Sequence, residues 1–265
     1  MNMKSKELLL ELNRRGLIPG PEESEAAFFA RCRRAAHLPS PPASSLAQHL
    51  FDIAPDWVEI NYTAKGLRFW EGACTWIEEN QITLQLHPAF LKKMTYWRYG
   101  REEVIAHELV HVVRGAFEEP VFEEILAYRT SSSPVRRFWG PILRSANESL
   151  IGVLSLMACT VAAFFEPLYL AAMTGTVGLL GGGIIRLVRT QRTFTSALHK
   201  IAELFGDEKA HAVMIRLTDR EIIRFSKMEV EAIAAYAVKM AKIHIRWKQI
   251  MAAYFERALS LNPGG

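Results

Sequence analysis

The chain has 265 residues, of which 50% are hydrophobic, 10% aromatic and 23% charged, a composition that excludes a disordered protein. Its 32 Lys and Arg exceed its 28 Asp and Glu by a mild +4, and no basic run is dense enough for a nucleic-acid partner. A lipid bilayer is the favoured partner instead. Three cysteines far apart in the sequence, Cys32, Cys74 and Cys159, predict neither a disulfide framework nor a Cys-based zinc site, and they suit a reducing, cytoplasm-facing chain.

The first 45 residues predict two helices and a linker. Residues 1–16 read as a short amphipathic helix that ends at Gly16, with no cleavage site of a secretory signal. A second helix is expected over Glu22–Ala36. Three prolines within residues 39–45 then predict a linker or turn.

The segment from Trp57 to Leu86 predicts a small sheet. It is rich in β-branched and aromatic residues, partly alternating, with turn signals between its three apolar runs. We expect about three antiparallel strands that end at Pro88. A catalytic core spanning residues 46–135 would contain this sheet.

Two helices are predicted after the sheet. The first begins near Gly100 with two acids in its opening turn and ends at Gly115. For the second, Pro120 suits the first turn, the helix runs to about Tyr128, and the serines and proline at 131–134 end it.

Residues 149–189 contain the two most apolar runs, Leu150–Phe165 and Leu168–Val188, separated only by Glu166 and Pro167. The second run reaches the roughly 20 residues that span a bilayer, and the first is slightly shorter. A membrane hairpin is the preferred interpretation. Basic flanks and an acidic bend place both flanks, and with them the catalytic region, on the cytoplasmic side; these flanks contain Arg136, Arg137, Arg144, Arg186, Arg189 and Arg192.

The alternative is a hairpin buried in a soluble oligomer or dipped into one leaflet, and the glycines between Gly175 and Gly183 would suit close helix packing.

The C-terminal segment 190–265 is expected to be helical. It should contain helices over Ala197–Phe205 and Glu208–Leu217, and then a long helix toward Leu259 that starts with a capping box at Thr218 and Glu221.

The chemistry is carried by His107-Glu108-Leu109-Val110-His111. Two histidines four residues apart project from one face of a helix and can hold a single Zn²⁺. The carboxylate of Glu108 then lies beside the metal, where it can accept a proton from the zinc-bound water and deliver one to the leaving amine. Such a match arises by chance in a chain of this length on the order of one time in a hundred. The helical, apolar setting of this match favours the metal site over a solvated helix face.

A catalytic zinc needs a third protein ligand and an open position. No histidine follows His111 until His199, so a carboxylate of the next helix is the natural supplier. Glu118 and Glu119 are expected to be acids of that helix's start. Of the remaining two, Glu124 is favoured because its helical neighbours are apolar and partly small, and Glu123 is the main rival.

The pair of segments His107–His111 and Glu124–Tyr128 resembles the active-site core of the gluzincin metallopeptidases. It is most similar to their membrane-embedded group, which includes the prenyl-protein endopeptidases and the bacterial heat-shock membrane protease. The resemblance covers roughly residues 80–130 and implies His107, His111 and Glu124 as zinc ligands and Glu108 as the base. Tyr128 stands where that group has an aspartate. The resemblance also implies an edge strand at Ile82–Pro88 to which an extended substrate adds.

The expected fold is therefore α+β and mainly α, a zincin-like domain with a hydrophobic helical hairpin. The expected function is that of a membrane-associated zinc endopeptidase acting on a peptide or protein substrate. The alternative is a membrane-anchored metal-binding or scaffold protein without turnover. Candidate stabilisers of the oxyanion are Tyr128, His199, His211 and Arg216, and structural roles are expected for His37, His49 and His244. His87, at the end of a strand, is expected to be solvated, with a distal polar contact as the alternative.

Overall fold

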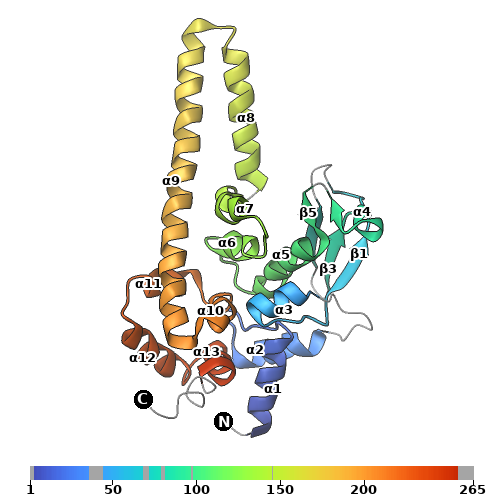
Figure 1. Ribbon diagram of the computed structural model, residues 1–265, viewed down its shortest axis with the longest axis vertical. Coiled ribbons are helices and arrows are strands. Elements are labelled where there is room, and N and C mark those ends of the chain that lie inside the picture. The colour runs from blue at the N-terminus through green and yellow to red at the C-terminus, as the bar shows by residue number, and fades with distance from the viewer. Residues whose placement is uncertain are drawn as a thin grey trace.

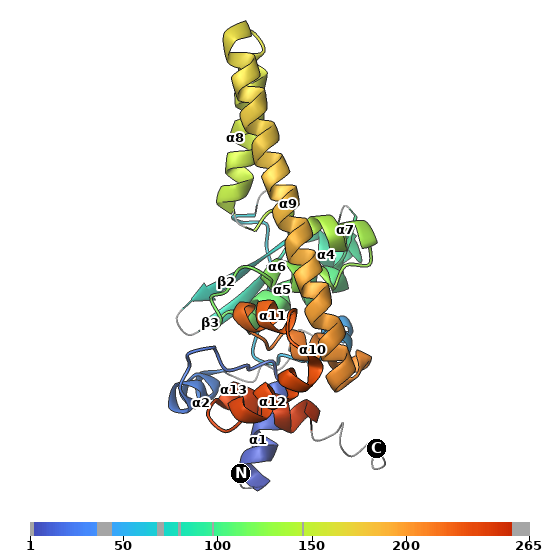
Figure 2. The same ribbon diagram turned by 90° about the vertical axis from the view of Figure 1, so that its left-hand side faces the viewer.

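A computed structural model describes residues 3–35, 44–67, 72–78, 81–96, 98–144 and 146–255. These residues form 13 α-helices, a three-stranded mixed sheet and a two-stranded hairpin (Figure 1). The expected mainly helical α+β class is confirmed. Most of the helices and the sheet form one body, and a pair of long helices projects from it (Figure 2).

The sheet contains β1 (Glu59–Tyr62), β2 (Ala73–Glu78) and β3 (Gln81–Leu86) in the order β1-β3-β2. β2 pairs antiparallel with β3, as predicted, but β1 pairs parallel with it. The predicted edge position of Ile82–Pro88 is wrong, because β3 is the central strand. β1 and β2 pair with its two edges, so its backbone groups are not open to an added strand.

Two of the three N-terminal helices follow the prediction with narrower bounds. They are α1 (Met3–Arg14) and α2 (Glu25–Arg34), and Ser44 caps a further helix, α3 (Ser45–Phe51). Most of the predicted linker at 39–45 lies outside the described residues. Gly16 ends the first helical segment with φ +69°, and a Cβ there would lie 2.7 Å from Val113. Glycine therefore allows the N-terminal segment to pack directly on the motif helix.

The motif helix is α5 (Arg101–Arg114), which confirms the predicted bounds. After the sheet, α4 (Ala89–Lys92) and the short strands β4 (Thr95–Tyr96) and β5 (Tyr99–Gly100) lead into it. The next helix, α6 (Glu123–Tyr128), begins later than predicted, so Pro120 lies outside it. Ser133 then caps α7 (Pro134–Trp139), which continues into the 3₁₀ turn η1 (Gly140–Ile142).

The projecting pair consists of α8 (Ala146–Ala162) and α9 (Glu166–Phe205), which run antiparallel (Figures 1 and 2). α9 is one helix of 40 residues, so the separate helix predicted from Ala197 is wrong. The apolar part of α9 is long enough to cross a membrane, with only 6% of that stretch buried. A Cβ added at Gly175, Gly178 or Gly181–Gly183 would meet nothing within 4 Å, so close packing of α8 on α9 does not use these glycines.

The C-terminal helices are α10 (Asp207–Met214), α11 (Asp219–Phe225), α12 (Val230–Met240) and α13 (Ile245–Ile250), followed by the π-helical turn η2 (Met251–Phe255). The capping box of Thr218 and Glu221 is confirmed. The long helix predicted after it is wrong, because the chain breaks twice. At the first break, Lys200 and Ser196 of α9 donate to the carbonyl of Ser226, a group that a continuing helix would use itself.

Candidate metal centre

The motif helix divides its residues between the core and an open face. Leu109 and Val110, the two middle residues of the motif, are fully buried in the main core. His107, Glu108 and His111 lie on the other side of the helix and are half-buried. The helical period thus holds the three polar groups together at the edge of the core.

Helix α6 faces them from across a short turn. Asp219, the first residue of α11, accepts from the backbone N–H groups of Val121 and Phe122 at 2.8 and 3.4 Å, and Glu119 accepts from the N–H of Asp219. The predicted role of Glu118 and Glu119 as opening acids of this helix is wrong, because its first-turn acids are Glu123 and Glu124. Long-range hydrogen bonds therefore fix the start of α6 against α11.

Three ligand-type atoms converge between α5 and α6. The Nε2 atoms of His107 and His111 lie 3.4 Å apart. The carboxylate of Glu124 reaches both, with one oxygen 3.6 Å from Nε2 of His111 and the other 3.9 Å from Nε2 of His107. These three residues have donor atoms that all lie within 4.8 Å of one another.

The far sides of both imidazoles are already occupied. Nδ1 of His111 lies 2.6 Å from a carboxylate oxygen of Glu123, and His107 hydrogen-bonds to the backbone of Ala127. In a neutral imidazole, an acceptor at Nδ1 keeps the ring proton there and leaves Nε2 with a lone pair for a metal ion. Glu123 and Glu124 consequently differ in geometry: Glu124 faces the converging nitrogens, whereas Glu123 lies behind His111.

The electrostatics of the cluster favour positive charge at its centre. Burial, and after it the charge of His111, lowers the pKa of His107 to about 3. Burial would also lower the pKa of His111, but the hydrogen bond to Glu123 and the nearby carboxylates raise it to about 9. Burial raises the pKa of Glu124, opposed by His111. A proton on His111 therefore supplies the cation that the surrounding acceptors need.

The donor set fits zinc. Two imidazole nitrogens and one carboxylate oxygen are ligands of catalytic zinc, and donors about 2.1 Å from one ion in a tetrahedron lie about 3.4 Å apart. The observed separations of 3.4, 3.6 and 3.9 Å are close to this value. Three protein donors leave a fourth position for a reactant.

Glu108 lies beside this cluster without joining it. The hydroxyl of Thr75 on β2 donates to its Oε2 at 2.8 Å, and its charge acts on both His111 and Glu124. The edge strand of the sheet therefore orients the carboxylate that the sequence assigns as the base. Nothing in the sequence pointed to Thr75, because a threonine on a strand is ordinary and its contact joins residues 33 positions apart.

Tyr128 is the one oxyanion candidate placed at the cluster. Its ring packs edge-on against His107, with 4.8 Å between the ring centroids, and burial raises its pKa to about 12. The turn η1 packs directly against the Tyr128 ring, because a Cβ on Gly140 would overlap that ring. The phenol therefore stays protonated and is held tightly, as a hydrogen-bond donor requires.

The remaining candidates lie elsewhere. Arg216 is fully buried and donates to Asn13 and to the carbonyl of Phe51, which excludes it from the site. His199 lines a separate surface pocket beside Arg129 and Phe138. His87 stacks on Tyr96 at 4.1 Å. Among the histidines expected to be structural, His37 lies outside the described residues.

Comparison of the chain with protein-family models, with curated proteins and with solved structures found no match.

Proposed function

We propose that the protein is a membrane-associated zinc endopeptidase with a zincin-like catalytic domain. The observation that carries the proposal is the convergence of two imidazole Nε2 atoms and one carboxylate on one point, where a metal ion can take the place of the proton on His111. His107, His111 and Glu124 would hold the ion. Zinc bound there would supply a Lewis acid that polarises a peptide carbonyl and makes water more acidic.

The chain's own groups would carry the proton transfers. Glu108, held by Thr75, takes a proton from the attacking water and passes it to the nitrogen of the leaving amine. The water oxygen first bonds to the carbonyl carbon, and the C–N bond then breaks as the amine nitrogen takes the proton from Glu108. Tyr128 donates a hydrogen bond to the negative charge that develops on the carbonyl oxygen. Glu123 holds His111 in the tautomer that directs Nε2 toward the ion.

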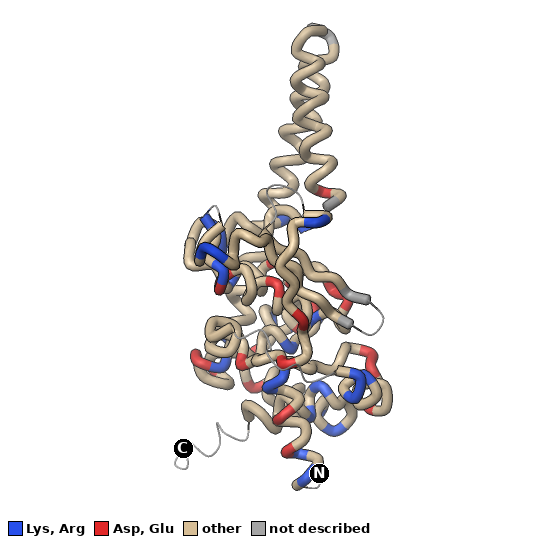
Figure 3. The backbone as a smooth tube through the Cα atoms, turned by 90° about the vertical axis from the view of Figure 1, so that its right-hand side faces the viewer, with Lys and Arg blue, Asp and Glu red and all other residues tan. Residues whose placement is uncertain are grey.

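The projecting hairpin supports the membrane part of the proposal. Its outer part carries almost no charged residue (Figure 3), and most of its large apolar side chains are exposed, among them Leu150 at 56% and Phe164 at 82%. Arg186 at its base pairs with Glu148 at 2.6 Å, and Arg144 donates to Thr190. Cationic residues at one end of an apolar hairpin match the cytoplasmic face of a bilayer.

Within the hairpin the few polar groups are paired. The hydroxyls of Ser155 and Thr176 lie 2.6 Å apart, and the thiol of Cys159 lies 3.5 Å from the same threonine oxygen. Hydrocarbon offers no partner to polar groups, so such pairing between α8 and α9 is what a membrane hairpin requires. Extraction of membranes at alkaline pH tests the proposal: the protein should remain in the pellet, and deletion of residues 149–189 should release it.

The decisive variant for turnover is Glu108→Gln. It keeps the size of the side chain and lies outside the ligand set, so zinc should stay at one equivalent while cleavage of an unfolded casein falls roughly 10³-fold or more. Lys65→Glu, on an exposed loop residue, is the matched control and should change neither value. Full activity of Glu108→Gln would contradict the mechanism. Zinc without any cleavage by the unaltered protein would support the metal-binding scaffold instead.

Tyr128→Phe tests the role of Tyr128 as the hydrogen-bond donor to the carbonyl oxygen. Loss of the phenolic donor should lower kcat about 10²-fold with KM little changed, because the hydrogen bond strengthens only as charge develops. The apolar ring that packs on His107 remains, so the zinc content should not change. An equal loss of kcat and zinc would mean that Tyr128 only supports the ligand.

A further inference from the structure

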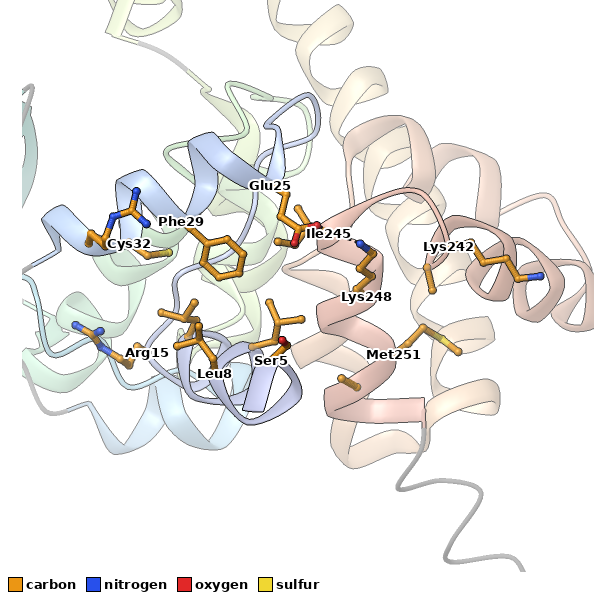
Figure 4. A pocket seen from close by; sticks show the side chains of 15 residues that line it. Ser5, Leu8, Arg15, Glu25, Phe29, Cys32, Lys242, Ile245, Lys248 and Met251 are labelled. Atoms are coloured by element: carbon orange, nitrogen blue, oxygen red, sulfur yellow. Dashed lines mark hydrogen bonds and ion pairs between the residues drawn. The ribbon is translucent and has the colours of Figure 1, made fainter. Parts of the chain in front are cut away.

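A groove lies at the end of the body opposite the hairpin. It has a volume of about 1100 Å³, and none of its lining residues belongs to the metal cluster. Side chains of α1 and α2 face those of α13 and η2 across it (Figure 4). The N-terminal and C-terminal parts of the chain therefore build it together.

Two walls of the groove are each a stripe along one helix, and the third crosses from the turn after α12 into α13 and η2. Residues three or four apart line up on one helical face, and the stripes of α1 and α2 have that spacing. The stripe of α1 spans 11 residues, from Ser5 to Arg15, and is therefore about 15 Å long. The stripes are Ser5, Leu8, Leu12 and Arg15 on α1, Glu25, Phe29 and Cys32 on α2, and Ala241, Ile245, Lys248 and Met251 at the C-terminal end.

The floor of the groove is apolar. Leu9, Leu12 and Ile245 are buried there and belong to a small core of their own. Burial raises the pKa of Cys32 to about 11, so its thiol stays neutral and adds to the apolar wall. Leu8 lines the groove yet is 43% exposed, which leaves an apolar surface that the other described residues do not cover.

The rim of the groove is cationic. Four basic residues line it against a single acid, Glu25. Lys248 pairs with Glu25 at 3.1 Å and Arg15 with Asp56 at 2.6 Å. The other two, Arg33 and Lys242, lie on opposite walls, are exposed and pair with no acid among the described residues.

The size of the groove matches a helix. The three walls around a common gap leave the place of a further helix, and a helix about 10 Å across and 15 Å long occupies roughly 1200 Å³. We propose that this groove docks an amphipathic helix of about ten residues from another protein, with leucine-type anchors toward α1 and acidic residues toward Arg33 and Lys242. A single anionic acyl chain would leave much of this volume empty.

The test uses the full-length protein and a designed peptide. A fluorescein-labelled helix with leucines at positions i, i+3 and i+7 and glutamates on both flanks should bind saturably in fluorescence anisotropy. The double variant Arg33→Glu/Lys242→Glu should weaken binding of this peptide roughly tenfold or more. A peptide with lysine flanks should bind the double variant about as tightly as the acidic peptide binds the unaltered protein. The control Lys65→Glu/Lys227→Glu changes two exposed cations away from the groove and should have no effect.

Leu8→Asp tests the apolar floor and should abolish binding, while an unchanged far-UV circular dichroism spectrum shows that the fold persists. Equal binding of the acidic peptide and its scrambled form would overturn the proposal, as would binding of oleate at a concentration where the peptide does not bind. Peptide binding to the groove does not require the metal, so its outcome is independent of whether Glu108→Gln abolishes cleavage.

Discussion

Two clusters of partly or fully buried ionisable groups, one around Glu221 and one around His107, differ in the hydrogen-bond donors that the rest of the fold gives them. Around Glu221, every oxygen of the carboxylate has a donor: Arg246 donates to both at 2.8 and 3.0 Å, Trp247 to one at 2.7 Å, and the N–H of Thr218 to the other at 2.8 Å. Between His107, His111 and Glu124, two ring nitrogens and a carboxylate face one another, and no other described residue donates to them.

The difference separates a structural cluster from a binding cluster. A buried acceptor without a partner costs free energy, and the Glu221 cluster avoids that cost by pairing within the chain. The cluster at His107 instead satisfies its outer atoms, through Glu123 and Ala127, and leaves its inner atoms facing one point. An external cation would complete it, and the same comparison predicts opposite responses to mutation in the two places.

The largest effect is expected for His111→Ala. Removal of one of three ligands should weaken zinc binding by roughly 10³-fold or more, beyond the 10–100-fold typical of an outer partner. Dialysis against a zinc chelator followed by metal analysis measures this. Glu221→Ala should retain its zinc under the same conditions, and equal loss from both variants would remove the distinction between the clusters.

Glu221→Ala should instead destabilise the fold. It leaves the guanidinium of Arg246, with 6% of its side chain exposed, without its carboxylate, and breaking such a buried pair costs about 3 kcal/mol. Urea denaturation followed by circular dichroism gives the free energy of unfolding. A change below about 0.5 kcal/mol, typical of surface substitutions, would show that the cluster is not structural.

Glu123→Gln should have an intermediate effect on the metal. The amide can still accept from Nδ1 of His111 but lacks the charge, so zinc affinity should fall about 10- to 100-fold. Glu124→Gln removes a ligand and should cost more. If Glu123→Gln lost more zinc affinity than Glu124→Gln, Glu123 would be the ligand and Glu124 would not.

The smallest expected effect is on the pH dependence of stability. Burial would raise the pKa of Glu221, but Arg246 and the hydrogen bonds hold it below its usual value of 4.5. A lowered folded pKa stabilises the fold above the unfolded value, and this contribution is lost as the pH falls below about 4.5. Thermal unfolding from pH 6 to pH 3 should therefore show a shallower decline for Glu221→Ala than for the unaltered protein.

Local signals carried most of the correct sequence predictions. Gly100 and Gly115 bounded α5, and Thr218 with Glu221 marked the start of α11. The central position of β3 and its parallel pairing with β1 could not be predicted, because strand order depends on contacts between distant segments. The break after α11 has the same cause: no glycine or proline marks it, and Lys200 of α9 imposes it from a distance.

At the candidate site, helical spacing brought His107, Glu108 and His111 together. The choice between Glu123 and Glu124 needed the angle between α5 and α6, since both residues lie in one turn and both approach His111. The contact of Thr75 with Glu108 and the fit of Tyr128 against Gly140 also depend on the folded arrangement. Sequence reasoning thus pointed to the residues of the cluster but not to Thr75 and Gly140, which orient two of them.

X-ray absorption at the zinc edge, on purified protein loaded with one equivalent of zinc, tests the central claim most directly. The account predicts nitrogen and oxygen neighbours at about 2.0–2.1 Å with the outer scattering of two imidazoles, falling to one in His107→Ala. Sulfur at about 2.3 Å, or a spectrum unchanged by His107→Ala, would contradict it.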